Sequence, residues 1–227
     1  GQFRESKTDK WYDLHNPSTG ETTGQAPCCT NDEVLEAIAA AKAAYPGWSA
    51  TPAIKRAQIL YRVRELILER MDELTMSVAK ENGKVWAESE GDVLKAKEGT
   101  ELATQVPSLM MGESIMDASR GYDTVKYREP LGVFAGIVPV NFPAMIPFGW
   151  MAPTCIAAGN TLVLKAASLT PKTAMLFAQL YKDAGVPDGV INVVTCSRNE
   201  INTILEHPDV KGITFVGSTP VGLKIYE

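Results

Sequence analysis

One amide side chain stands alone in the segment GIVPVNFPAMIP, residues 136–147. Asn141 lies between Pro139 and Pro143 at the end of an apolar run, and no charged residue occurs from 130 to 164. Flanking prolines restrict the backbone, so the amide N–H group would be a preorganised donor of the kind that stabilises a developing oxyanion. Asparagine before an aromatic residue and a proline is also typical of an ordinary turn, and both interpretations stay open at this point.

Two other places could contact a phosphate or a sugar. Lys165 ends the segment TLVLK and could donate to a ribose hydroxyl or a phosphate, although strand ends often carry a solvated lysine. Gly217 permits a tight turn, and Ser218 can cap a helix whose free N–H groups face a phosphate; an ordinary strand-to-helix turn has the same pattern. A Walker loop is rejected, because Gly222 has its spacing but Leu223 stands where that loop requires lysine.

The second half of the chain must position these residues. Apolar, β-branched segments (GVFAGIV, TLVLK, VINVVT and VKGITFVG) alternate with helical patterns, which predicts an α/β fold with an open parallel sheet buried on both faces. Cys196 and Arg198 follow the third strand. A structural role explains each of them, Cys196 as a buried thiol and Arg198 as a residue at the start of a helix. Ligands of such sheets bind beyond the carboxyl ends of the strands, so we expect the site at residues 139–142, 165–168, 195–198 and 217–222.

The first 111 residues predict a hairpin and three helices. Turn signals at residues 16–20 separate two strands, and Thr30 with Glu33 forms a capping box at the start of the first helix. That helix presents Val34, Leu35, Ile38 and Ala41 on one face.

The next two helices are predicted from caps and apolar spacing. Thr51 caps one long helix with Pro52 at its first position, and this helix continues to the stop at Asn82-Gly83. A third helix runs from Glu88 to about Met110, with Gly91 and Gly99 as weak points. After it, alternation in residues 112–130 predicts an exposed ribbon.

Composition excludes several classes of protein. A net charge of −5 gives no basic field for nucleic acid or an anionic membrane, and 45% hydrophobic residues suit a globular core. Four cysteines and two histidines lack metal-ligand spacing, so no metal site is expected. The uncharged run could span a bilayer by length, but Pro139, Pro143, Pro147 and Pro153 inside it favour strand, helix and strand instead. The first residues lack a signal-peptide pattern, which favours the cytoplasm, or the mitochondrial matrix in a eukaryote.

The chain resembles the NAD(P)-dependent aldehyde dehydrogenase superfamily over essentially its whole length. The resemblance is carried by PLGVFAGIVPVNFP, AGNTLVLKAAS, AGVPDGVINVV and HPDVKGITFVGSTPVG, in the order and spacing of the family. The segments VFAGIVPVNFPAMIPFGWMAP and VVTCSRNE look most like the acylating methylmalonate-semialdehyde dehydrogenases, which make an acyl-CoA rather than a free acid. The resemblance implies a Rossmann-like NAD-binding sheet and an oligomerisation arm.

The resemblance also implies roles for individual residues. The side chain of Asn141 would form half of an oxyanion hole, and Lys165 would reach the adenosine ribose. Gly217 and Ser218 would hold the pyrophosphate at the start of the last helix. The other cofactor-binding positions that it implies are Ile137, Val138, Pro139, Val140, Ser168 and Gly222.

Three departures from the family pattern bear on these roles. Residues 165–168 read Lys-Ala-Ala-Ser where the family usually has Lys-Pro-Ser-Glu, so Ser168 replaces a carboxylate that binds ribose hydroxyls and the choice between NAD and NADP stays open. Cys196 stands where glycine is frequent, and Val140 stands where many members have an aromatic residue. None of the four cysteines lies in the family's nucleophile motif, so we expect an N-terminal portion of a longer enzyme, inactive alone.

The predicted organisation is a hairpin and helices of the NAD-binding domain in 1–111, an oligomerisation arm in 112–130 and the sheet core in 131–227. The predicted function is NAD-dependent oxidation of a methylmalonate- or malonate-semialdehyde-like aldehyde to an acyl-CoA, with CoA as co-substrate and a homodimer or homotetramer as the assembly. Two alternatives stay open: a semialdehyde dehydrogenase that releases the free acid, and a non-catalytic nucleotide-binding or assembly module.

Overall fold

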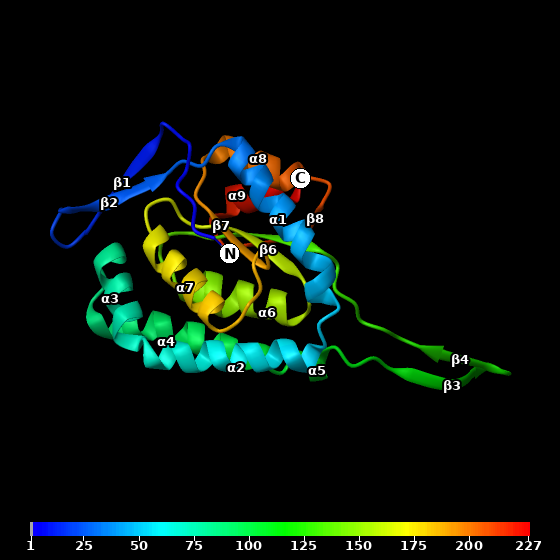
Figure 1. The fold of residues 1–227 in the computed structure, drawn as a ribbon. Coiled ribbons are helices and arrows are strands. Elements are labelled where there is room, and N and C mark those ends of the chain that lie inside the picture. Colours follow the sequence, from blue (N-terminus) through cyan, green and yellow to red (C-terminus); the bar gives the residue numbers. More distant parts are fainter. Residues whose placement is uncertain (1) are drawn as a thin grey trace.

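A four-stranded parallel sheet forms the centre of the computed structural model, which describes residues 2–227 (Figure 1). Its strands lie in the order β7-β6-β5-β8, so the predicted open parallel sheet is confirmed. Their bounds are β5 Val133–Ile137, β6 Thr161–Lys165, β7 Ile191–Val194 and β8 Val210–Phe215. The connections between strands run through helices, as parallel strands require.

Helices cover both faces of the sheet, because successive side chains of a strand point to opposite faces. On β6, Leu162 and Leu164 enter the larger of two apolar clusters, whereas Val163 enters the smaller one. The helices on the larger cluster are α2 (Ala53–Glu69), α3 (Met71–Asn82), α4 (Trp86–Ala103), α5 (Val106–Leu109), η1 (Ile146–Met151), α6 (Ala152–Ala157) and α7 (Pro171–Asp183). The smaller cluster is covered by α1 (Asn31–Ser49) and α8 (Arg198–Glu206), and α9 (Thr219–Tyr226) follows β8.

The predicted hairpin and the predicted start of the first helix are both confirmed. Strands β1 (Trp11–His15) and β2 (Thr22–Pro27) pair antiparallel. The capping box at α1 is complete, since the backbone N–H of Thr30 donates to Glu33 Oε2 at 2.7 Å and the N–H of Glu33 donates to Thr30 Oγ1 at 3.3 Å.

The predicted single long helix is wrong, because the chain breaks at Arg70 into α2 and α3. Arg70 has φ −111° and ψ 21°, outside helical values, and its guanidinium pairs with Glu73 and Asp183. One non-helical residue leaves the apolar spacing on either side almost in phase, so the pattern could not reveal the break. The predicted cap is also wrong: the Thr51 hydroxyl donates back to the Gly47 carbonyl at 3.0 Å, and α2 begins one residue after Pro52.

The third predicted helix ends earlier than expected and has no weak points. Helix α4 passes unbroken through Gly91 and Gly99, ends at Ala103, and is followed by the separate short helix α5. A Cβ atom on Gly99 would lie 2.1 Å from the carbonyl oxygen of Gly149, so the glycine permits contact between two backbones. Glycine at 99 is therefore explained by packing against η1.

The helix after β5 contains a π-helical turn that the sequence pattern did not predict. In η1 the N–H of Ala152 donates to the Pro147 carbonyl, five residues back. Pro153 has no N–H to offer the Phe148 carbonyl, which accepts from the Tyr181 hydroxyl at 3.3 Å instead. A buried carbonyl is thereby satisfied from α7.

The predicted exposed ribbon is present as an antiparallel hairpin of β3 (Ser114–Ser119) and β4 (Tyr122–Val125). Every residue of both strands is exposed, and the hairpin extends away from the body of the molecule (Figure 1). Within residues 2–227, no helix has the length and apolar character needed to cross a bilayer.

We predict that Gly99→Ala destabilises the fold by about 3 kcal/mol, because the added methyl group collides with a rigid backbone. The matched control is Gly91→Ala on the same helix, where a Cβ atom meets nothing within 4 Å. This control is expected to stabilise by about 0.5–1 kcal/mol through helix propensity. Urea unfolding followed by circular dichroism measures both, and equal effects of the two substitutions would contradict the backbone contact.

Candidate functional site

The carboxyl ends of the strands lie in one row at one edge of the sheet. Ile137 at the end of β5 pairs with Lys165 of β6 on one side and with Phe215 of β8 on the other, and Lys165 pairs with Val194 of β7. Neighbouring strands are about 4.8 Å apart, so the segments that follow these residues share a small region. All four predicted strand ends therefore meet at this edge.

The segment after β5 brings Asn141 to the surface of this edge. Ile137 and Val138 are buried, so only their backbone can be presented to a ligand, whereas Pro139 is half-buried and Val140 is exposed. The Asn141 side chain is exposed and has no hydrogen-bond partner among residues 2–227. Its amide is therefore available as a donor.

Lys165 is a mostly buried amine without a carboxylate partner in the described part of the chain. Desolvation lowers its pKa from the ordinary value, and the nearby thiols of Cys196 and Cys28 oppose that shift. An unpaired amine that is costly to bury fits a site where a ligand hydroxyl or phosphate would complete its hydrogen bonds. Ser168, three residues on, lies in the half-buried turn that leads to α7.

The turn after β8 is formed by different interactions from those expected. Ser218 is the N-cap residue of α9 but its side chain makes no capping hydrogen bond, so the expected side-chain cap is wrong and the hydroxyl is free. Gly217 does not adopt a positive φ; a Cβ atom there would lie 2.5 Å from the ring of Phe215. The same ring lies 3.3 Å from the Cβ position of Gly222. Both glycines therefore let the turn close over Phe215.

The cysteines of the chain are buried or half-buried. All four are free thiols. Burial raises the pKa values of Cys155 and Cys196 to about 12, and it also raises that of Cys29. Thiolate is the reactive form, so these thiols are suited to packing. Among residues 2–227, no three His, Cys, Asp or Glu side chains are placed to hold a metal ion.

Two buried carboxylates next to the edge were not predicted. Glu81 of α3 is 6% exposed and accepts hydrogen bonds from the backbone N–H groups of Lys172 and Thr173, the first turn of α7. Asp92 of α4 accepts from the N–H of Met145, in the segment that follows Asn141. Helical spacing offered a signal for Glu81, because Leu74, Val78 and Glu81 fall on one face.

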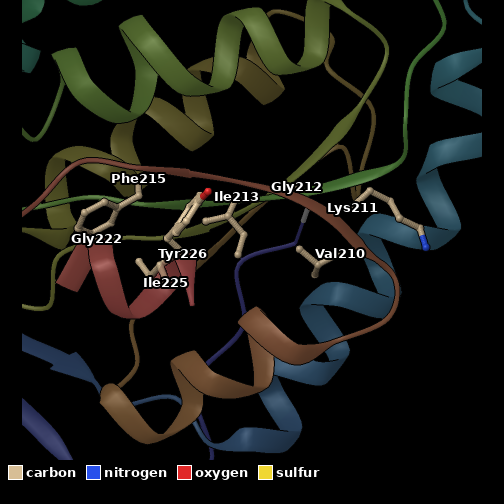
Figure 2. A pocket seen from close by; sticks show the side chains of 8 residues that line it. All are labelled: Val210, Lys211, Gly212, Ile213, Phe215, Gly222, Ile225 and Tyr226. Atoms are coloured by element: carbon tan, nitrogen blue, oxygen red, sulfur yellow. The ribbon is translucent and has the colours of Figure 1, made fainter. Parts of the chain in front are cut away.

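A hollow between β8 and α9 lies beside this edge and has a different character (Figure 2). Its side chains are mainly apolar, including Val210, Ile213 and Ile225, and the amine of Lys211 points away from them. Of the predicted site residues it contains only Gly222. This hollow is an exposed apolar face, and it does not contain the amide of Asn141 or the amine of Lys165.

Comparison with known proteins gives a consistent result at two levels. The profile described as the aldehyde dehydrogenase family matches residues 3–227. The mitochondrial acylating methylmalonate-semialdehyde/malonate-semialdehyde dehydrogenase of Homo sapiens is 44% identical over 227 residues, which are 100% of this chain and 42% of that protein. Malonate-semialdehyde dehydrogenase 2 of Geobacillus kaustophilus (strain HTA426) is 45% identical over the same residues, which are 47% of its length. The chain thus spans less than half of either relative.

A solved structure from Sinorhizobium meliloti 1021, determined in complex with NAD, shares the fold. It is 34% identical to the chain with a TM-score of 0.96, and the match covers 99% of this chain and 46% of that one. At this similarity the arrangement of the sheet and its flanking helices is common to both proteins.

Glu81 predicts a pH dependence of stability. Burial is the largest influence on its pKa and raises it, while the hydrogen bonds from α7 partly offset the rise. The native carboxyl then keeps its proton at pH values where the unfolded one, with a pKa of about 4.3, has lost it. Stability relative to Glu81→Gln is therefore expected to fall as pH rises from about 4 through the folded-state pKa. Urea unfolding of both proteins across this range tests the sign. A free energy of unfolding of the wild type that rises with pH relative to that of Glu81→Gln would contradict it.

Proposed function

The chain belongs to the aldehyde dehydrogenase family, and on that premise we propose that it is the cofactor-binding portion of an NAD-dependent enzyme. The proposed substrate is a methylmalonate- or malonate-semialdehyde-like aldehyde and the proposed product is an acyl-CoA, in line with the names of its relatives. The observation that carries the proposal is the single row of strand ends that brings together Lys165, the Asn141 segment and the turn at Gly217.

The residues at this edge fit a dinucleotide. The unpaired amine of Lys165 would donate to the adenosine ribose, and the free hydroxyl of Ser218, with the backbone N–H of Thr219 at the start of α9, would bind the pyrophosphate. The backbone from Ile137 to Val140 would line the nicotinamide. When bound, NAD supplies the acceptor for the hydride that leaves the aldehyde carbon. Ser168 carries no charge, so it leaves room for NADP as well.

Asn141 has the chemistry of an oxyanion donor. When a nucleophile adds to the aldehyde carbon, its oxygen becomes negatively charged, and an amide N–H aimed at that oxygen lowers the barrier. Loss of one such donor typically costs about 2.7–4 kcal/mol. Because burial raises the pKa values of Cys29, Cys155 and Cys196, we expect no turnover by the chain alone, and aldehyde-dependent NADH formation would contradict this.

The acceptor of the acyl group distinguishes two versions of the proposal. CoA would give an acyl-CoA, as in the acylating relatives, whereas water would give the free acid. The human relative is named as acylating, and this word is the support for CoA as the proposed acceptor. Its mitochondrial location likewise makes the mitochondrial matrix, or the bacterial cytoplasm, the proposed compartment.

We expect NAD to bind saturably to the chain in a calorimetric titration. Lys165→Ala should weaken binding about tenfold, equivalent to about 1.4 kcal/mol, because it removes a charged donor. Ser218→Ala should weaken it about threefold, since a neutral hydrogen bond contributes less. The control is Lys55→Ala on an exposed position of α2, which should leave affinity unchanged. No binding to a folded sample, or an equal loss in the control, would favour the assembly-module alternative.

The exposed hairpin of β3 and β4 supports a role in assembly. Large apolar side chains are exposed along it, among them Ile115, Met116 and Tyr122. We propose that it pairs with a second copy of the chain, giving a dimer or tetramer. Replacing residues 114–125 by a short glycine-serine linker should convert the oligomer to a monomer in sedimentation velocity, with the helical circular dichroism unchanged. A wild-type chain that sediments as a monomer would count against this role.

A further inference from the structure

The segment that carries Asn141 is held on both sides of that residue. The contacts come from the end of α3, the turn after it and α4, which precede Asn141 by roughly 50 to 60 residues. We propose that Asn82 and Lys84, with Asp92 holding Lys84, are positioning residues that fix the direction of the Asn141 amide. This inference rests on the proposed role of Asn141 as the oxyanion donor.

The residue before Asn141 is held by Asn82. Helix α3 ends at Gly83, whose left-handed φ of 74° turns the chain away from the helix axis. The side chain of Asn82, the last helical residue, then donates from Nδ2 to the carbonyl oxygen of Val140 at 2.7 Å. The peptide group that joins Val140 to Asn141 is thereby tied to the end of α3.

The residue after Asn141 is held by Lys84. Its ammonium lies 3.9 Å from the centroid of the Phe142 ring, within the range of a cation–π interaction. The Lys84 side chain is only 15% exposed, and such contacts are stronger when the cation is desolvated. Both sequence neighbours of Asn141 therefore have a specific partner.

Asp92 supplies the charge that keeps Lys84 in place. Its side chain is 0% exposed, its Oδ2 lies 3.2 Å from the Lys84 ammonium, and its Oδ1 accepts from the Met145 N–H at 2.7 Å. A buried carboxylate is costly unless it is paired and hydrogen-bonded, and here both oxygens are used. An apolar pair could fill the same space but could not hold the ring of Phe142 and the N–H of Met145 in a fixed relation.

The direction of the Asn141 side chain depends on the contacts of Asn82, Lys84 and Asp92, because the side chain itself has no partner within residues 2–227. An oxyanion donor acts only when it is preorganised toward the developing charge, and a displacement of about 1 Å can cost about a hundredfold in rate. The direction of the side chain then follows from its backbone, which the contacts of Asn82, Lys84 and Asp92 restrain.

The test is the backbone order of Asn141, measured by 15N relaxation on the full chain. In the wild type we expect an order parameter of about 0.85, the value of rigid backbone, and in Lys84→Met a value below about 0.6. Lys84→Arg keeps the cation for both Asp92 and Phe142 and should restore order. Asn82→Ala leaves the ion pair intact and should also lower the order of Asn141, which keeps the test usable if Lys84→Met fails to fold.

The matched control is Lys97→Met, on the same helix as Asp92. Lys97 is 18% exposed and pairs with Glu101 at 3.1 Å, and it makes no hydrogen bond or ion pair with residues 139–145, so this variant loses an ion pair that does not hold Asn141. Unchanged order in Lys84→Met and Asn82→Ala, or an equal loss in Lys97→Met, would overturn the proposal. The measurement needs neither NAD nor aldehyde, so a failed NAD titration would reject the proposed function without changing this result.

Discussion

The structure depends on side-chain acceptors for the buried backbone N–H groups of the segments that enter and leave the central sheet. A parallel sheet leaves loops and helix starts at both ends, and a buried N–H without a partner is costly. Three buried side chains supply the acceptors: Asn160 for Leu131 and Gly132 at the entry to β5, Asp92 for Met145 beyond its exit, and Glu81 for the start of α7. These contacts thus determine both the position of Asn141 and the point at which the chain enters α7 after β6.

Close packing around η1 adds a second restraint on the same region. Gly99 and Gly149 bring the backbones of α4 and η1 into contact, and the hydroxyl of Tyr181 fills the hydrogen-bonding position that Pro153 leaves open at Phe148. Helices α4 and α7 are therefore tied to η1 by backbone contact and by a buried hydrogen bond. Because Asp92 lies on α4 as well, one helix connects the packing of η1 to the position of the Asn141 segment.

Much of this arrangement could be read from the sequence, because it follows from local patterns. Alternating strands and helices predicted the parallel sheet, and Thr30 with Glu33 predicted the start of α1. The break at Arg70 was missed because one non-helical residue barely changes the apolar phase, and the π-turn of η1 because its residues are apolar in any helical register. The contacts of Lys84 and Asp92 with the segment around Asn141 were missed for another reason: Phe142 and Met145 lie more than 50 residues from them in the sequence, and no local spacing relates residues so far apart.

The strands that form the candidate site are buried to different degrees. Asn141 follows β5 and Lys165 ends β6, and both strands are mostly buried, whereas β8 is only partly buried and α9 has no buried residue. Elements with few buried contacts open at low free-energy cost, and the turn proposed to bind a pyrophosphate joins two such elements of residues 2–227. Ordering that turn consumes part of the interaction energy. At the proposed dinucleotide site, the cost of ordering β8 and α9 would therefore lower the affinity more than any rearrangement at Lys165, which ends the buried strand β6.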